Sequence, residues 1–406
     1  MIFASRWLLP IDRPPLERGW IETDGGTIVR LGSGPPPGPA TDLGNAALLP
    51  GLVNAHTHLE LSWLRGRVPP AGSFIEWLRT LLAVRGRGAL PALPEQLQAM
   101  RAGIEEARAT GTVLVGDISN TLVTPALLAS AGMSAVVFHE LLGFNVVDAT
   151  TVVAEARSRL RRVFADARAH AADGVDLRGR VVAHAPYSVA PDLFRRIARL
   201  SDDDAPLSVH VGESVEELEL LRVGTGPMRA LLEDLGVWTE RWQPPGTGPV
   251  AWLDTLGYLQ PGTLAVHAVH LDESDIDRLV ERDAVVVICA RSNVWVGTGL
   301  PRVSHLYAAG ARIAIGTDSL ASVGSLNMFD ELAELRRVAP DVTAASLLES
   351  ATRTGAEALG AGDRYGTLAP GKAAALVAVD VPAGVRDVEE YLVGGVPPEA
   401  IRPVPT

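Results

Sequence analysis

The sequence predicts an α/β protein with two parts: a (β/α)8 barrel, and a small β-sandwich-like domain built from both chain termini. Three observations lead to this expectation: short apolar runs recur along the chain, helical stretches separate them, and the two ends lack this alternation. The apolar runs are rich in Val, Ile, Leu and Ala without a polar residue at every second position, as in strands buried on both faces. Alternating strands and helices predict a parallel sheet, and eight strands favour closure into a barrel.

The eight predicted barrel strands are spread over the middle of the chain. They cover residues 48–56, 112–117, 135–140, 181–184, 207–210, 264–267, 284–289 and 312–318. The helical stretches between them include residues 95–109, 152–169, 213–235, 273–282 and 326–337. We therefore expect the barrel to occupy residues 51–359.

The two ends of the chain show a different pattern. Residues 1–50 contain short strand-like pieces separated by glycine, and a proline-rich turn at 35–39. Residues 360–406 hold a turn and a further strand at 374–379. Because turn signals and short strands dominate both segments, we expect residues 1–50 and 360–406 to form one small β domain.

Composition excludes several classes of protein. The chain has 406 residues, of which 47% are hydrophobic and 21% charged, as in ordinary globular proteins. Its net charge is −12 and it has no run of Lys or Arg, so we expect no nucleic-acid partner. The single cysteine, Cys289, excludes an internal disulfide and Cys-rich zinc sites, and we interpret it as an inert buried thiol.

Neither a signal peptide nor a membrane span is expected. Residues 1–15 lack a basic start, and their apolar stretch breaks at Pro10. Residues 118–138 carry no charge and are long enough to cross a bilayer, but they contain Asn120, Pro125 and other polar or breaking residues. We interpret this segment as a buried helix followed by a strand, and we expect a cytoplasmic protein. The sequence does not specify the oligomeric state, and a homodimer, the commonest oligomer, is compatible with it.

Polar residues gather at the C-terminal ends of the predicted strands, where barrels of this kind place their active sites. His56 and His58 end the first strand, and two imidazoles at i and i+2 of an extended segment point the same way. His210 ends the fifth strand, His267 the sixth and Asp318 the eighth. Three imidazoles and a carboxylate suit Zn²⁺ or Fe²⁺, so we expect one divalent metal ion.

Each signal also has a structural interpretation. A His-x-His pair alone is weak, Glu213 is also compatible with the first turn of a helix, and Asp318 with a helix N-cap. Five polar residues at the same ends of four strands are nevertheless hard to attribute to chance. A catalytically silent scaffold would lack at least one ligand or proton carrier, and none is missing here.

These motifs resemble those of the amidohydrolase superfamily. Residues 49–58, Leu-Pro-Gly-Leu-Val-Asn-Ala-His-Thr-His, are similar to its opening motif. The later motifs follow in the family's order: His210-Val-Gly-Glu213, His267-Ala-Val-His270, Ser292-Asn293, Gly316-Thr-Asp318 and the C-terminal signature at 368–374. The set resembles the aminohydrolase branch, which includes cytosine, guanine, adenosine and S-adenosylhomocysteine deaminases. Residues 56–62, 73–78 and 184–188 are similar to the 6-aminodeoxyfutalosine deaminases of menaquinone biosynthesis.

The resemblance implies a metal site and a reaction. His56, His58, His210 and Asp318 would bind the ion, which lowers the pKa of water towards neutrality. His267, or alternatively His270, would hydrogen-bond the attacking water. Asp318 would accept the proton of that water, and Glu213 would act as general acid and base.

One departure from the family pattern bears on the number of metal ions. Members with two metals usually carry a carboxylated lysine at the end of the fourth strand, whereas the single lysine here, Lys372, lies in the C-terminal signature. The fourth strand instead ends in His184. The resemblance therefore implies one metal ion.

The implied substrate is a purine nucleoside. The expected reaction is hydrolytic deamination of 6-aminodeoxyfutalosine to futalosine and ammonia. The alternatives are adenosine, methylthioadenosine, S-adenosylhomocysteine, guanine or a triazine.

Candidate substrate contacts lie beside the metal motif. His184 ends the fourth strand and either faces the substrate or is a buried structural histidine. Glu60 either binds ribose hydroxyls or pairs with an arginine, and Asn293 either holds a base edge or is a turn residue. Glu140 ends the third strand, with His139 as its alternative. The candidate partners for a substrate carboxylate are Arg65, Arg67, Arg85 and Arg291.

Overall fold

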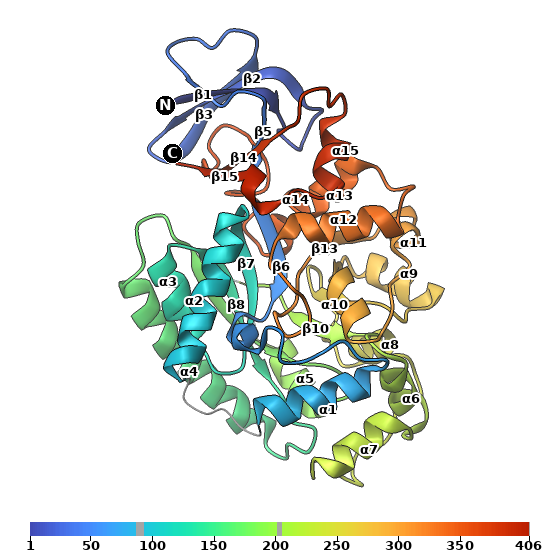
Figure 1. Cartoon of the computed structure of the whole chain (residues 1–406). Coiled ribbons are helices and arrows are strands. Elements are labelled where there is room, and N and C mark those ends of the chain that lie inside the picture. The colour runs from blue at the N-terminus through green and yellow to red at the C-terminus, as the bar shows by residue number, and fades with distance from the viewer. Residues whose placement is uncertain (87–92, 201–204, 406) are drawn as a thin grey trace.

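The barrel strands form two parallel four-stranded sheets in the computed structural model of the chain, which describes residues 1–86, 93–200 and 205–405 (Figure 1). The first sheet contains β6 (Leu52–Thr57), β7 (Thr112–Ser119), β8 (Ser134–Leu141) and β9 (Leu177–Ala183). The second contains β10 (Ser208–Val211), β11 (Leu264–His267), β12 (Val285–Ile288) and β13 (Arg312–Ile315). Each predicted barrel strand therefore corresponds to an observed strand.

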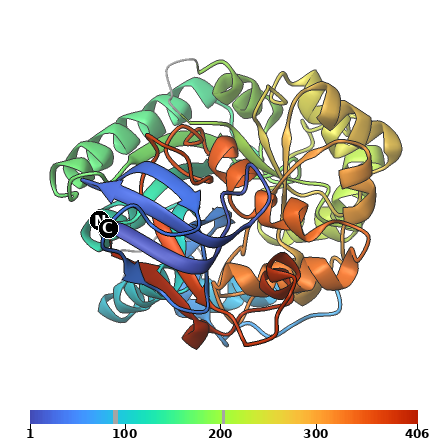
Figure 2. The ribbon, with the colours of Figure 1, turned by 90° about the horizontal axis from the view of Figure 1, so that it is seen from above.

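Individual hydrogen bonds connect the two sheets into a ring. At one junction the backbone N–H of His210 donates to the carbonyl of His184 over 2.9 Å. At the other, the N–H groups of Thr317 and Asp318 both donate to the carbonyl of His56 over 3.1 Å. Seen from above, helices surround this ring (Figure 2). The predicted barrel architecture is confirmed, and both junctions lie at residues expected in the site.

The helices follow the strands around the outside of the ring. Those of the first half are η1 (Leu59–Leu64), α1 (Phe74–Arg85), α2 (Pro94–Ala109), α3 (Thr124–Ala131), α4 (Ala149–Ala169) and α5 (Pro191–Ala198). The middle of the chain forms α6 (Val215–Val223), α7 (Pro227–Asp234), α8 (Pro249–Thr255), α9 (Glu273–Glu281), α10 (Ala290–Trp295) and α11 (Val303–Ala308). The last are α12 (Met328–Val338), α13 (Ala344–Ser350), α14 (Arg353–Ala358), α15 (Val388–Val393) and η2 (Pro398–Ala400).

Two hydrophobic layers hold the barrel together. Inside the ring, side chains such as Val53, Val136 and Val287 form one buried cluster. Outside it, the amphipathic helices pack on the strands, and α4 buries Leu160 and Phe164 on one face. All four residues of β12 are buried, which explains why its sequence is apolar without alternation.

Both termini contribute to one further sheet, at the top of Figure 1. Its strand order is β15-β14-β5-β1-β2-β3, with β4 also paired to β1. The strands are β1 (Ile2–Leu8), β2 (Leu16–Asp24), β3 (Thr27–Ser33), β4 (Thr41–Asp42), β5 (Ala46–Pro50), β14 (Leu376–Asp380) and β15 (Ile401–Val404). This arrangement supports our proposed division of the chain into a terminal β unit and a barrel.

Two predicted elements are each divided in the structure. The strand expected at 48–56 is β5 of the terminal sheet followed by β6 of the barrel, and Gly51 lies between them. A Cβ atom at Gly51 would lie 2.2 Å from the side chain of Val113, so only glycine fits this crossing. The helix expected at 213–235 is α6 followed by α7, because Gly224 ends α6 in a left-handed conformation with φ of 73°.

The uncharged segment 118–138 forms the end of β7, then α3, then most of β8. This matches the expected helix followed by a strand. Within the described parts of the chain, no helix combines the length and the apolar character needed to cross a membrane.

Candidate active site

A cavity of about 430 Å³ opens at the C-terminal ends of the barrel strands. Its polar end is lined by His58, Glu140, His184, His210, Glu213, His267 and Asp318. Its remaining wall is mainly apolar and comes largely from α1 and α7, which lie at the end of the barrel away from the terminal sheet (Figure 1). The volume falls in the range of small-molecule sites. Seven residues singled out in the sequence therefore share one pocket.

Three of the predicted metal ligands form one histidine cluster. The ring centroid of His56 lies 5.0 Å from that of His58 and 4.9 Å from that of His210. One ring nitrogen from each of the three histidines lies within 4.8 Å of the others. The fourth predicted ligand is adjacent, since Oδ1 of Asp318 lies 3.5 Å from Nε2 of His58. This donor set of imidazoles and a carboxylate fits one divalent ion.

His56 provides an independent test of that fit. Its side chain is fully buried, and neither ring nitrogen has a hydrogen-bond partner among the described residues. Burial holds the pKa of His56 well below its usual value, so the ring is neutral and has a lone pair to offer. Because buried polar atoms are rarely left unpaired, these nitrogens point to a ligand such as a metal ion.

His210 and Glu140 form a buried imidazole–carboxylate pair at the polar end of the cavity. Oε1 of Glu140 lies 3.2 Å from Nε2 of His210. Burial favours a neutral carboxyl, but the neighbouring His184 and His210 prevail and hold the pKa of Glu140 well below its usual value. The Glu140 carboxylate in turn raises the pKa of His210 against the effect of burial. A metal ion bound to His210 would therefore have to displace a proton.

One ring nitrogen of His267 makes a hydrogen bond away from the histidine cluster, and the other faces the cluster. Its Nδ1 donates to Oδ1 of Asn293 over 2.8 Å, which assigns the lone pair to Nε2. That Nε2 lies 3.0 Å from Nδ1 of His210 and 3.6 Å from Oε1 of Glu213. His270, the alternative, instead places Nε2 3.0 Å from the carbonyl of Thr298 and does not line the cavity.

Glu213 is a buried carboxyl group at the polar end of the cavity. Burial raises its pKa to about 8, although the positive His210 opposes this shift, and the nearby Asp318 and Glu217 carboxylates add to it. The hydroxyl of Tyr187 hydrogen-bonds its side chain. A group with this pKa holds a proton at neutral pH and can both donate and accept one.

Two further predicted contacts line the cavity. His184, at the end of β9, has Nδ1 2.5 Å from the hydroxyl of Ser188. Glu140, in β8, accepts a hydrogen bond from Nδ2 of Asn120 through Oε2 over 3.0 Å. His139, the alternative to Glu140, does not line this cavity and has Nδ1 3.0 Å from the carbonyl of Ser119.

Glu60 and Asn293 do not line the cavity. The Glu60 carboxylate lies behind the wall, where it accepts hydrogen bonds from Ser119, from the backbone of Asn120 and from Thr121. Asn293 lies behind His267. Because neither group faces the cavity, the prediction that they contact the substrate is not supported.

The four candidate arginines differ in position. Only Arg85 lines the cavity; its Nη2 donates to Oδ1 of Asn120 over 3.1 Å and lies 3.4 Å from Oε1 of Glu60. Arg65 pairs with Glu106, Arg67 lies over the ring of Trp63, and Arg291 pairs with Glu331.

Sequence reasoning missed part of the cavity. It did not assign Asn120, Tyr187 or the apolar wall, although Tyr187 belongs to the motif at 184–188 and α1 begins in the motif at 73–78. The single lysine, Lys372, does not line this cavity. Its Nζ donates to the carbonyls of Gly362 and Tyr365, in the segment before the terminal strand β14.

Curated relatives share most of the chain. It is 31% identical over 336 residues to an aminodeoxyfutalosine deaminase of Deinococcus radiodurans, covering 80% of this chain and 76% of that protein. It is 30% identical over 337 residues to a 5-methylthioadenosine/S-adenosylhomocysteine deaminase of Desulforudis audaxviator, covering 81% and 71%.

Solved structures share the fold. An aminofutalosine deaminase of Helicobacter pylori in complex with methylthio-coformycin superposes with a TM-score of 0.83 at 25% identity, covering 97% of this chain and 95% of that one. An adenosine deaminase of Xanthomonas campestris with bound zinc superposes with a TM-score of 0.82 at 28% identity, covering 98% and 90%. The amidohydrolase family model matches residues 47–401. The chain therefore belongs to the amidohydrolase family and is a metal-dependent aminohydrolase.

Proposed function

We propose that this enzyme deaminates 6-aminodeoxyfutalosine, an adenine nucleoside with a benzoate-bearing arm, to futalosine and ammonia. The observation that carries the proposal is the division of the cavity into two parts. Its polar end suits an adenine ring and a metal ion, whereas α1 supplies an apolar wall that includes Phe74, Trp77 and Leu81. Arg85, the last residue of the same helix, also lines the cavity. An aryl group suits the wall, and the guanidinium suits its carboxylate.

The runner-up substrates fit this wall less well. The arm of S-adenosylhomocysteine ends in an amino acid, whose ammonium group would need an acceptor beside α1 and α7, where most lining side chains are apolar. Methylthioadenosine has only a small methylthio arm and would leave much of the wall uncovered. Adenosine has no arm at all. One relative is named a 5-methylthioadenosine/S-adenosylhomocysteine deaminase, so these two compounds are the alternative substrates.

The proposed metal ligands are His56, His58, His210 and Asp318. We propose zinc, with iron(II) as the alternative, because the mixed imidazole and carboxylate set suits both and the Xanthomonas relative contains zinc. A divalent ion held by these residues would lower the pKa of water and so supply hydroxide near neutral pH.

The side chains of the chain itself supply the proton transfers. Asp318 accepts a proton from the attacking water, and Nε2 of His267 accepts a hydrogen bond that orients it. Glu213 donates a proton to the ring nitrogen beside the reacting carbon as water adds there. The ionised Glu213 then takes the proton of the new hydroxyl group and passes it to the departing amine, so that ammonia leaves and a carbonyl remains. The proton left on Asp318 returns to Glu213 through solvent, which restores both carboxyl groups. His184 and Glu140 are the proposed substrate contacts, because both line the polar end.

A substrate panel tests the proposal. The purified zinc-loaded enzyme is assayed for ammonia release with 6-aminodeoxyfutalosine, adenosine, methylthioadenosine, S-adenosylhomocysteine and guanine, and kcat/KM is compared. We expect 6-aminodeoxyfutalosine to exceed the others by about tenfold or more, the scale of one well-placed charged contact. A Glu213→Gln preparation controls for contaminating deaminases. Equal or higher kcat/KM for another nucleoside would overturn the substrate assignment.

A further inference from the structure

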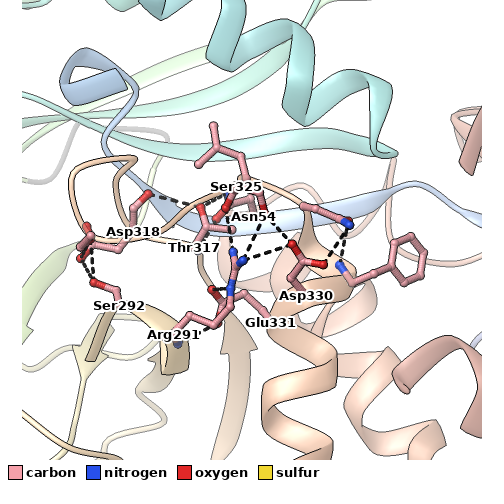
Figure 3. Close-up of polar contacts among 12 residues, drawn as sticks. Asn54, Arg291, Ser292, Thr317, Asp318, Ser325, Asp330 and Glu331 are labelled. Atoms are coloured by element: carbon pink, nitrogen blue, oxygen red, sulfur yellow. Dashed lines mark hydrogen bonds and ion pairs between the residues drawn. The ribbon is translucent and has the colours of Figure 1, made fainter. Parts of the chain in front are cut away.

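Three consecutive residues connect the two groups that flank the proposed water position. Arg291, Ser292 and Asn293 lie in the short helix α10, directly after β12. Figure 3 shows the first two of them, Arg291 and Ser292. Ser292 and Asn293 are buried, and neither lines the cavity. They therefore act, if at all, through other side chains rather than by touching the substrate.

Ser292 contacts the carboxylate of Asp318. Its Oγ donates to Oδ2 of Asp318 over 2.5 Å, as Figure 3 shows. The Oγ of Ser322 lies 2.8 Å from that of Ser292 and 3.3 Å from the same carboxylate oxygen. With Oδ2 held in this way, Oδ1 is the carboxylate oxygen that faces His58, 3.5 Å from its Nε2.

Asn293 contacts the ring of His267. Its Oδ1 accepts the hydrogen bond from Nδ1 of His267 over 2.8 Å. Its Nδ2 has no hydrogen-bond partner among the described residues. The carbonyl half of the amide therefore makes the contact that selects the tautomer of His267, with the lone pair on Nε2.

Arg291 anchors this segment to the neighbouring helix α12. Its Nε donates to Oε1 of Glu331 over 2.7 Å, and its Nη2 donates to the carbonyl of Ser325 over 2.7 Å. Nη1 lies 3.2 Å from Oδ2 of Asp330. Figure 3 shows these contacts beside the bond from Ser292 to Asp318. The side chains of Ser292 and Asn293 thus extend from a fixed start of α10.

The two groups that they hold have unusual backbone conformations. Asp318 has φ of 60° and His267 has φ of 73°, a region that residues with a Cβ atom rarely adopt. Such conformations persist where surrounding contacts over-determine them. The backbone N–H of Asp318 donates to the carbonyl of His56, and its carbonyl accepts from Oγ1 of Thr57 over 2.8 Å. The side-chain contacts from α10 complete this restraint.

We propose that Ser292 and Asn293 are paired positioning residues: Ser292 orients Asp318 towards the metal ion, and Asn293 orients His267 and fixes its tautomer. The inference rests on the proposed function for the roles of Asp318 and His267. It adds that adjacent residues of one helix contact both groups proposed to flank the water, so a single element couples their positions.

Zinc affinity tests the role of Ser292 without any substrate. Zinc is titrated into the metal-free protein in competition with a chromophoric chelator. Ser292→Ala should weaken zinc binding by about 10- to 100-fold, the usual effect of removing a partner of a metal ligand. The matched control is Ser350→Ala, which removes a buried hydroxyl that contacts Tyr307; neither residue lines the cavity. Equal zinc affinities of these two variants would overturn the role of Ser292.

Two substitutions separate the acceptor of Asn293 from its volume. Asn293→Asp keeps an oxygen for Nδ1 of His267, whereas Asn293→Leu keeps the approximate size and removes the acceptor. We expect Asn293→Leu to lower kcat by about 10- to 100-fold with KM and zinc affinity little changed, and Asn293→Asp to recover most of the loss. Nitrogen NMR of the labelled histidines should show the Nδ1–H tautomer of His267 in wild type and its loss in Asn293→Leu. Identical spectra for these two proteins would overturn the role of Asn293.

Separate control experiments distinguish a loss of folding from a loss of function. Circular dichroism and thermal unfolding are recorded for every variant; if Ser292→Ala does not fold, Ser292→Cys keeps the size with a weaker donor and should show a smaller loss of zinc affinity. A wild-type enzyme that binds zinc but deaminates no nucleoside would contradict the proposed function. The zinc titrations and NMR spectra would still decide the positioning roles, because neither measurement uses substrate.

Discussion

The backbone N–H of Glu213 donates a hydrogen bond to Oε2 of Glu217 over 2.9 Å. This bond places two buried carboxyl groups together at the start of α6, whose N-cap Ser214 lies between them. One of the two faces the cavity, whereas the other does not line it. Glu217 therefore fixes the backbone from which Glu213 projects, and its own protonation affects stability.

Glu217→Gln should alter how stability depends on pH. Burial raises the pKa of Glu217 from 4.5 to about 7, although backbone hydrogen bonds oppose the shift. Between these values the folded state keeps a proton that the unfolded state has lost, so the contribution of Glu217 to stability falls as pH rises through this window. Glutamine does not titrate. The variant should therefore gain up to about 3 kcal/mol relative to wild type between pH values of about 4.5 and 8.

Urea unfolding of both proteins in chelator, at the two pH values, measures this difference without changes in metal occupancy. The same difference in unfolding free energy at both pH values would contradict a raised pKa for Glu217.

Glu213→Gln should separate proton transfer from metal binding. The amide keeps the size of the side chain but cannot donate a proton to the ring nitrogen and take one back. We expect kcat to fall by about 10²- to 10⁴-fold, the usual contribution of a general acid–base group. Zinc content should match that of wild type, because Glu213 is not among the proposed ligands. Normal turnover of this variant would remove Glu213 from the mechanism.

The strand-end residues could be predicted from sequence because parallel strands place their C-terminal ends at one edge. His56, His210 and Asp318 each follow an apolar run, and this local pattern was enough to predict that they lie together at one end of the barrel. The prediction of one continuous helix at 213–235 was wrong, because the sequence pattern does not show that Gly224 adopts a left-handed conformation that ends the first helix.

Residue roles that depend on tertiary contacts could not be predicted from the sequence. Glu60 lies next to the metal motif, but the short helix η1 directs its carboxylate to the segment after β7. Asn293 follows a strand as a substrate contact would, yet it holds His267 from behind. The left-handed backbone of His267 has no sequence signal, since glycine is the residue that normally marks such a conformation.

Removing the metal should abolish activity reversibly. Dialysis against a chelator should inactivate the enzyme, and one equivalent of zinc should restore activity. His56→Ala should bind zinc at least about tenfold more weakly, because it removes an imidazole that is neutral and unpaired in the metal-free protein. His270→Ala is the matched control, since its ring does not line the cavity. Full activity after complete removal of metal, checked by elemental analysis, would contradict the proposed site.

Arg85→Met should change substrate preference more than turnover. The methionine keeps an unbranched apolar chain on the wall but removes the cation that we propose contacts the benzoate. The KM for 6-aminodeoxyfutalosine should rise by about 10- to 100-fold, as expected for loss of a charged hydrogen bond. Kinetics with methylthioadenosine should stay within about threefold of wild type, since that compound has no carboxylate.

Arg67→Met is the control for Arg85→Met, because Arg67 lies over the ring of Trp63 and does not line the cavity. Equal losses for both nucleosides in Arg85→Met would show a general disturbance of the wall rather than recognition of a carboxylate.

Gly316→Ala should damage the site through the backbone of β6. A Cβ atom at Gly316 would lie 2.7 Å from the carbonyl oxygen of His56 and 2.8 Å from its Cβ. These contacts are too short for either neighbour to stay in place, and the same carbonyl accepts the N–H of Asp318. We expect a loss of about 1–3 kcal/mol of stability, as for other overpacked cores, together with weaker zinc binding. Gly324→Ala is the matched control, because an added Cβ there meets no atom within 4 Å. Chemical unfolding and zinc titration of the two variants measure both effects, and an unchanged zinc affinity in Gly316→Ala would show that His56 can shift without loss of the metal site.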